Sequence, residues 1–166
     1  MANYNAILSV DFTNVSATEP VTLNDAKLYC KIDDLITFDD PLISQLIIAA
    51  REVIEAYTNE ALTTRTVTAI MCNLCGNVYL PYSPVTSAVT LSDASGEVLG
   101  GKNAYIKTPI TDYITATYTA GYTASTLPKK YIEAIKMQVA YMYENRGDLQ
   151  VAPTVKTILS NARKLF

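Results

Sequence analysis

The chain has 166 residues, of which 49% are hydrophobic and 17% charged, so it has the size and composition of one folded domain and not of a disordered polymer. It contains no histidine, which excludes Ser-His-Asp and Cys-His catalytic arrangements and histidine metal sites. Its net charge of −3 provides no overall positive field for holding a nucleic-acid backbone.

The first twenty residues are rich in Asn, Thr, Ser and small apolar residues and show no helical period. They predict an extended arm or an edge strand. No basic segment followed by an apolar stretch opens the chain, and no apolar run approaches the roughly 18 residues of a membrane span. The sequence therefore predicts neither a secretory signal nor a membrane partner.

Thr22 opens the first predicted helix, over residues 22–30. Thr22 and Asp25 have the spacing of a capping box. In a capping box the Thr22 side chain bonds exposed backbone N–H groups of the first turn, and the Asp25 side chain reaches back to Thr22. Leu23, Ala26 and Cys30 fall on one stripe of that helix. A short connector with four aspartates follows, and it predicts a solvated, capping segment. Calcium binding or a catalytic carboxylate pair are the alternatives, but an EF-hand's central glycine and final glutamate are missing. These aspartates are Asp33, Asp34, Asp39 and Asp40.

The second predicted helix runs over residues 41–58, with Asp40 as N-cap, Pro41 at the first helical position and Asn59 as terminator. Arg51 and Glu55 stand four residues apart and are expected to pair on the exposed side. The apolar side chains form one broad face, so we expect burial over much of the circumference. That face consists of Leu42, Ile43, Leu46, Ile47, Ala49, Ala50, Val53, Ile54 and Tyr57.

Residues 62–120 change to short β-rich runs separated by Gly, Pro and Asp signals, a pattern typical of a small antiparallel sheet. Residues 93–96 have turn composition and predict a hairpin between the runs 85–91 and 97–99. The glycines of residues 96–101 lack a following helix and a P-loop lysine, so we interpret them as turns and not as a phosphate loop. Cys72 and Cys75 have the spacing of half a zinc site, but a complete site would need carboxylates or a second chain.

A third long helix is predicted from Pro128 to about residue 146, and Gly147 suits its left-handed end. A short amphipathic tail follows. We expect this tail to dock on its own chain or on a neighbour, and its apolar side chains are the candidate interface. They are Val155, Ile158, Leu159, Leu165 and Phe166.

The predicted fold class is α+β: a bundle of three to four helices with a small antiparallel β-sheet subdomain inserted between the second and third main helices. We expect a single domain over residues 1–166. Its predicted parts are an N-terminal arm (1–20), a helical core (21–61 and 127–147), a β subdomain (62–122) and a C-terminal tail helix (148–166).

Three ordered stretches of the sequence resemble the head-to-tail connector, or adaptor, family of tailed bacteriophages. The first runs from Glu19 through Lys27 to Asp33, and the second from Asp40 through Thr58 to Leu62. The third runs from Tyr118 to Tyr122 and continues with Leu127-Pro128 and the helix ending at Gly147. Met142 departs from the pattern, because the family often carries a larger aromatic residue before Tyr143.

The resemblance implies a non-enzymatic structural protein of the virion neck, with no catalytic, cofactor-binding or metal-binding residues. Such proteins form a ring, here expected to hold about twelve subunits, that joins the portal protein of the capsid vertex to a stopper or tail protein. DNA passes through the ring without sequence-specific binding. The implied location is the virion neck, after assembly in the cytoplasm of the host bacterium.

Two alternatives stay open at the level of sequence. One is another neck or tail protein, such as a stopper or tail terminator. The other is a metal-dependent module that uses Cys72, Cys75 and the aspartates of residues 33–40.

Overall fold

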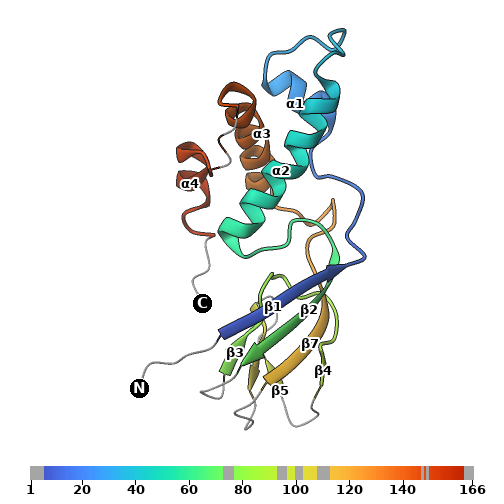
Figure 1. Cartoon of the computed structure of the whole chain (residues 1–166), viewed down its shortest axis with the longest axis vertical. Helices are drawn as coiled ribbons and strands as arrows, with labels where there is room; N and C mark the ends of the chain where they lie inside the picture. The colour runs from blue at the N-terminus through green and yellow to red at the C-terminus, as the bar shows by residue number, and fades with distance from the viewer. Residues whose placement is uncertain are drawn as a thin grey trace. The chain divides into compact units, whose positions relative to one another are not determined.

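The structure is a computed structural model that describes residues 6–72, 77–92, 97–99, 103–107, 113–146, 148 and 150–162. The described residues form four helices and seven strands (Figure 1). In chain order these are β1 (Ala6–Thr13), α1 (Leu23–Tyr29), α2 (Asp40–Thr58), β2 (Arg65–Cys72), β3 (Asn77–Tyr79), β4 (Thr90–Leu91), β5 (Glu97–Leu99), β6 (Tyr105–Lys107), β7 (Tyr113–Ala120), α3 (Lys129–Glu144) and α4 (Pro153–Leu159).

The chain divides into two compact units. One comprises residues 1–16 and 63–123, with residue 166, and contains the strands. The other comprises residues 17–62 and 124–165 and contains the helices. The α+β class predicted from the sequence is therefore confirmed.

The strands form two antiparallel sheets, of order β1-β2-β7-β4 and β3-β6-β5. In the larger sheet, β2 and β7 alternate buried and half-buried residues over most of their length, which is the pattern of a sheet with one face on a core. Their register pairs Val67 with Tyr118 and Met71 with Ile114 on the buried side. On the other side, threonines of β2 pair with threonines of β7, as at Thr66 and Thr119.

One prediction about the sheet is correct only in part, since β2 to β7 do lie between α2 and α3, and a second is wrong. The sheet is not simply inserted between the second and third main helices, because β1 precedes every helix and pairs with β2 at the edge of the larger sheet. The N-terminal segment is thus an edge strand over Ala6–Thr13. The runs 85–91 and 97–99 do not form a hairpin either, since β4 pairs with β7 whereas β5 pairs with β6. The turn at residues 93–96 and most of the glycine run 96–101 lie outside the described residues.

Gly121 fixes the chain's path directly after β7. Its φ is +115°, a region that side-chain-bearing residues rarely adopt, and a Cβ atom at this position would lie 2.2 Å from the Thr63 carbonyl oxygen. Three residues before Gly121, on the buried side of β7, the Tyr118 hydroxyl donates a hydrogen bond to the Pro81 carbonyl. Burial, and then the neighbouring Tyr82, raise the pKa of Tyr118, which keeps that hydroxyl protonated as a donor.

The helical unit is built on α2 and α3, which pack against each other. The buried face of α2 is narrower than predicted: Ile43, Ile47, Ala50 and Ile54 are buried, whereas Leu42, Leu46, Ala49, Val53 and Tyr57 are half-buried. The helix begins one residue earlier than predicted, with Asp39 at the N-cap, and Asn59 ends it in a left-handed conformation as expected. Helix α3 supplies the facing core residues Tyr131, Ala134, Ile135, Gln138, Val139 and Met142.

Candidate functional site

An ion network ties two of the family-like stretches together inside the helical unit. Arg51 donates from Nε to Glu19 Oε2 and from Nη1 to Glu55 Oε2, both at 2.8 Å. Burial alone would lower the pKa of Arg51, but the carboxylates of Glu19 and Glu55 outweigh it, so the pKa is raised. The predicted Arg51–Glu55 pair is confirmed, but it is buried and not on the exposed side. Glu55 also accepts the Leu62 N–H at 2.7 Å, so the network also fixes the C-terminal end of the second stretch.

A buried lysine organises the connector between α1 and α2. Lys27 is only 2% exposed, and its ammonium donates to the carbonyls of Asp34 (3.0 Å) and Ile36 (2.7 Å). It also lies 2.9 Å from Asp40 Oδ1, an ion contact, although that oxygen accepts no aligned hydrogen bond. Because a buried ammonium must keep its partners, this contact set holds the connector in one conformation.

The aspartates of the connector have separate structural roles. Asp33 accepts the N–H of Leu35 at 2.9 Å, Asp40 pairs with Lys27, and Asp39 accepts the Tyr143 hydroxyl at 2.7 Å. The last bond raises the pKa of Tyr143. The exposure of Asp33 and Asp34 agrees with the predicted solvated segment. The predicted capping role of Asp40 is wrong, because Asp39 is the N-cap of α2 and its side chain makes no cap hydrogen bond.

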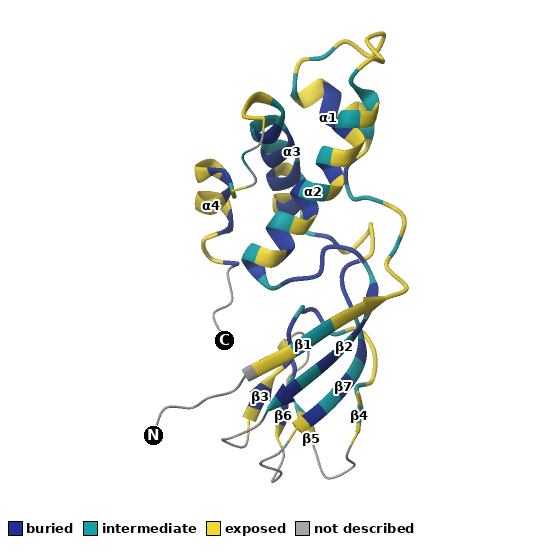
Figure 2. Ribbon diagram, in the orientation of Figure 1, coloured by how far each residue is buried: buried dark blue, intermediate teal, exposed yellow. Residues whose placement is uncertain are grey.

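The connector also exposes large apolar side chains. Phe38 is 91% exposed, Leu35 89% and Ile36 52%, and we call these three residues the connector patch. Figure 2 shows this segment as exposed, in contrast to the buried faces of the helices beneath it. Burying a Leu or Phe side chain is worth about 1.5 to 3 kcal/mol, so the isolated chain forgoes this gain at each position. The sequence pattern does not predict this exposed patch, because three apolar residues in a polar connector show no helical or strand period.

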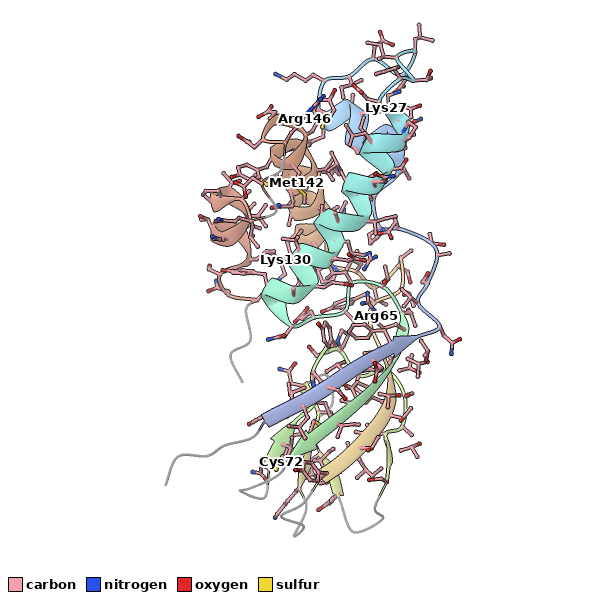
Figure 3. All side chains as sticks on the ribbon, viewed as in Figure 1. Lys27, Arg65, Cys72, Lys130, Met142 and Arg146 are labelled. Carbon is pink, nitrogen blue, oxygen red and sulfur yellow. The ribbon has the colours of Figure 1, made fainter. Side chains whose placement is uncertain are left out.

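A shallow groove lies in the same unit, lined by Leu42 and Leu46 of α2 and by Met142, Tyr143 and Arg146 at the end of α3. Figure 3 shows Met142 on α3 and Arg146 just beyond the C-terminal end of that helix. The groove has a volume of about 220 Å³, which is below the roughly 300 to 1,000 Å³ of small-molecule sites. It therefore suits one or two inserted side chains better than a cofactor.

The structure separates the five candidate interface residues of the tail. Val155 and Leu159 are buried in the helical unit, whereas Ile158 is 40% exposed. Leu165 and Phe166 lie outside the described residues. The buried Gln138 holds the tail against α3, because its amide donates to the Gln150 carbonyl at 2.8 Å and accepts the Ala152 N–H at 2.9 Å.

The fold has known counterparts among solved structures. A chain from a structure described as "Neck of empty GTA particle computed with C6 symmetry" matches with a TM-score of 0.75 and 19% identity, covering 96% of this chain and 97% of that one. A chain from "Virion of native gene transfer agent (GTA) particle" matches with the same TM-score and coverage at 17% identity. This chain shares their fold. No protein-family model and no curated protein sequence matches it.

The shared fold spans almost the whole of both chains, so it includes the strand-containing unit as well as the helices. The resemblance drawn from the sequence rested mainly on the helices and on residues 118–122. The fold match therefore adds the β1-β2-β7-β4 sheet. Of this sheet, the family-like stretches include only residues 118–120 of β7.

Metal and redox chemistry finds little support in the part of the chain that the structure describes. Those residues include no group of three or more Cys, Asp or Glu side chains placed to hold a metal ion. Cys72 is half-buried, and its predicted partner Cys75 lies outside the described residues. Burial, and then the nearby Glu144, raise the pKa of the Cys30 thiol, which makes it a poor nucleophile. The described helices include none with the length and hydrophobicity that a membrane crossing requires.

Proposed function

We propose that this chain is a structural, non-enzymatic protein of the neck of a phage-like particle, where it assembles as a ring. The observation that carries the proposal is the fold match to a chain of a particle neck, with a TM-score of 0.75 over 96% of this chain. A match of this extent covers both units and is not a shared motif. The missing histidines support a non-catalytic role.

The specific role we propose is that of the connector between portal and tail. The ring would bind the portal protein on one side and a stopper or tail protein on the other, and would extend the DNA channel without reading sequence. Support comes from the three family-like stretches, of which the first and second are joined by the ion network of Glu19, Arg51 and Glu55. The protein would act in the virion neck, after assembly in the cytoplasm of the host bacterium.

The proposed ring holds about twelve subunits. The matching neck structure was computed with C6 symmetry, and a ring with six-fold symmetry holds six copies of a chain or a multiple of six. In such a ring each subunit presents two different surfaces to its neighbours, and the contact closes by rotation.

We propose the C-terminal tail as a second contact, in which its buried and exposed side chains have different roles. Val155 and Leu159 are buried, so they support the helical unit and would contact a partner only if α4 undocked. Ile158 is exposed, and the terminal residues Leu165 and Phe166 complete the proposed contact. Replacing Ile158 with Asp therefore tests assembly without removing a buried side chain. Deleting residues 163–166 tests the proposed contact of Leu165 and Phe166.

The experiment is an attachment assay with particles that have a portal but lack this protein. Purified full-length chain should bind these particles at the portal vertex and allow tails to attach, and electron microscopy should show a ring beneath the portal. Binding to free tails but not to portal-bearing particles would instead favour a tail terminator. Binding only to particles already completed by another neck protein would favour a stopper.

The same purified chain can be used to test the alternative that the protein is a metal-dependent module. Elemental analysis is expected to find no stoichiometric metal. One zinc per chain that is lost on replacing Cys72 and Cys75 with Ser would support the metal module against the structural role.

A further inference from the structure

We propose that the connector patch of one copy of this chain packs into the α2–α3 groove of a second copy. The inference deepens the proposed function, on which it rests, by naming a contact between neighbours in the ring. It depends on three observations: a rigid apolar projection, a groove that can accept it, and opposite charges on the two surfaces.

The connector patch is held in place by Lys27 of α1. The Lys27 ammonium binds the carbonyls of Asp34 and Ile36, two residues within or beside the patch, and the lysine itself is buried. Figure 3 shows Lys27 on α1 at the base of this connector. Here the consequence is that Leu35 and Phe38 point into solvent without having to be ordered when a partner binds.

The groove offers the matching chemistry. Leu42, Leu46 and Met142 give it an apolar lining, and Tyr143 and Arg146 add polar groups at its side. Tyr143 is already oriented, because its hydroxyl donates to Asp39. The chain's own patch does not fill the groove, since Phe38 is 91% exposed. The groove is therefore open to an apolar side chain from outside.

Charge favours a second copy as the occupant. The exposed Asp33 and Asp34 stand directly before the patch, and the exposed Arg146 lines the groove. An acidic projection and a groove with an arginine are complementary. Because patch and groove are different surfaces of one chain, the contact is heterologous and can repeat from copy to copy, which is what a ring requires.

The first test measures self-association of the full chain by sedimentation at concentrations up to about millimolar. Phe38→Asp should weaken self-association at least tenfold. Ile48→Asp is the matched control, because Ile48 is 43% exposed on α2 and lies away from Leu42 and Leu46 around the helix; it should change association less than twofold. Arg146→Asp and Asp34→Arg should each weaken association, and the double variant should recover at least half of the loss. Equal effects of Phe38→Asp and Ile48→Asp, or no recovery in the double variant, would overturn the proposal.

The second test identifies the occupant directly. A photo-reactive phenylalanine analogue at position 38 is activated in a mixture of isotopically heavy and light full-length chains. Heavy–light cross-links should form and map to residues 42–46 and 142–146. Absence of heavy–light cross-links, or cross-links to another surface, would refute the contact.

The two proposals can fail separately. Cross-linking between copies in solution tests the contact without any particle, whereas attachment to portal-bearing particles tests the neck assignment. In assembled particles, a cross-link from position 38 to the portal or to a tail protein would show that the patch binds a different partner, and it would overturn this inference while leaving the proposed function standing.

Discussion

At the scale of single residues, Gly121 is the position with the least tolerance in the described structure. A Cβ atom would lie 2.2 Å from the Thr63 carbonyl oxygen, on a backbone with φ of +115°. We therefore expect Gly121→Ala to destabilise the strand-containing unit by about 2 to 4 kcal/mol, through strain and backbone displacement together. Amide hydrogen exchange in β2 and β7 measures this loss for the unit itself. Thr115→Ala, a half-buried position on the same strand, is the control and should cost less than about 1 kcal/mol.

The hydrogen bond between Tyr141 and Asp148 makes a pH-dependent contribution to stability. The Tyr141 hydroxyl donates to Asp148 at 2.6 Å, and this bond, followed by the Gln150 N–H, lowers the pKa of Asp148. A carboxyl whose pKa is lowered by folding stabilises the protein above its unfolded value of 3.8, and this contribution is lost as the pH falls through the folded value. The same bond raises the pKa of Tyr141 above 10.0, so the contribution is also lost at strongly alkaline pH.

Tyr141→Phe should consequently lower the urea midpoint of unfolding at pH 7 and have a smaller effect at pH 3, which lies below the unfolded pKa of 3.8, so that the unfolded carboxyl binds a proton. Denaturation curves of the natural chain and the variant at both values give the comparison. A midpoint difference of equal size at pH 3 and pH 7 would mean that the bond contributes nothing that depends on the charge of Asp148.

At the scale of elements, the attachment of α4 depends on one buried side chain. Gln138 uses both ends of its amide to hold residues 150–152, and its loss would leave the buried Ala152 N–H without a partner. We expect Gln138→Leu to cost about 1 to 3 kcal/mol and to speed hydrogen exchange throughout α4. Met137→Leu is a nearly isosteric control on the same helix and should cost less than about 1.5 kcal/mol. Unchanged protection of α4 in Gln138→Leu would show that Val155 and Leu159 alone hold the helix.

The long helices could be predicted because several local signals agree. The capping interaction of Thr22 with Asp25, Pro41 near the start of α2, and the left-handed Asn59 at its end all act within a few residues of sequence. The apolar residues of these helices recur with a period of 3.6 residues, which identifies the buried face. The face of α2 was predicted too broadly, since a stripe pattern does not show which flank a neighbouring helix covers.

The sheet pairing could not be predicted, because the decisive contacts are distant in sequence. β4 has only two residues and pairs with β7, which lies more than twenty residues further along the chain. A turn-like sequence at residues 93–96 therefore suggested the wrong partner for a strand too short to specify its own register. The same limit applies to the candidate site: Lys27 could not be placed beneath the connector patch from sequence, since nothing in the local pattern shows a lysine to be buried.

At the scale of the whole molecule, the exposed apolar side chains of the two units favour the proposed assembly. The helical unit keeps its charges paired inside, as at Arg51 and Lys27, and leaves apolar side chains of the connector outside. The edge strand β1 adds Leu8 at 51% exposure, and an uncovered strand edge with apolar residues is a common site of contact between chains. A monomer gains nothing from these surfaces, whereas a ring of copies can cover them.

Cryo-electron microscopy of the intact particle that carries this chain tests the central claim most directly. The account predicts a closed ring of this chain at the portal vertex, with six copies or a multiple of six, and with the connector of each copy against the α2–α3 groove of its neighbour. A neck in which the chain is absent, or is present as a single copy without ring symmetry, would contradict it.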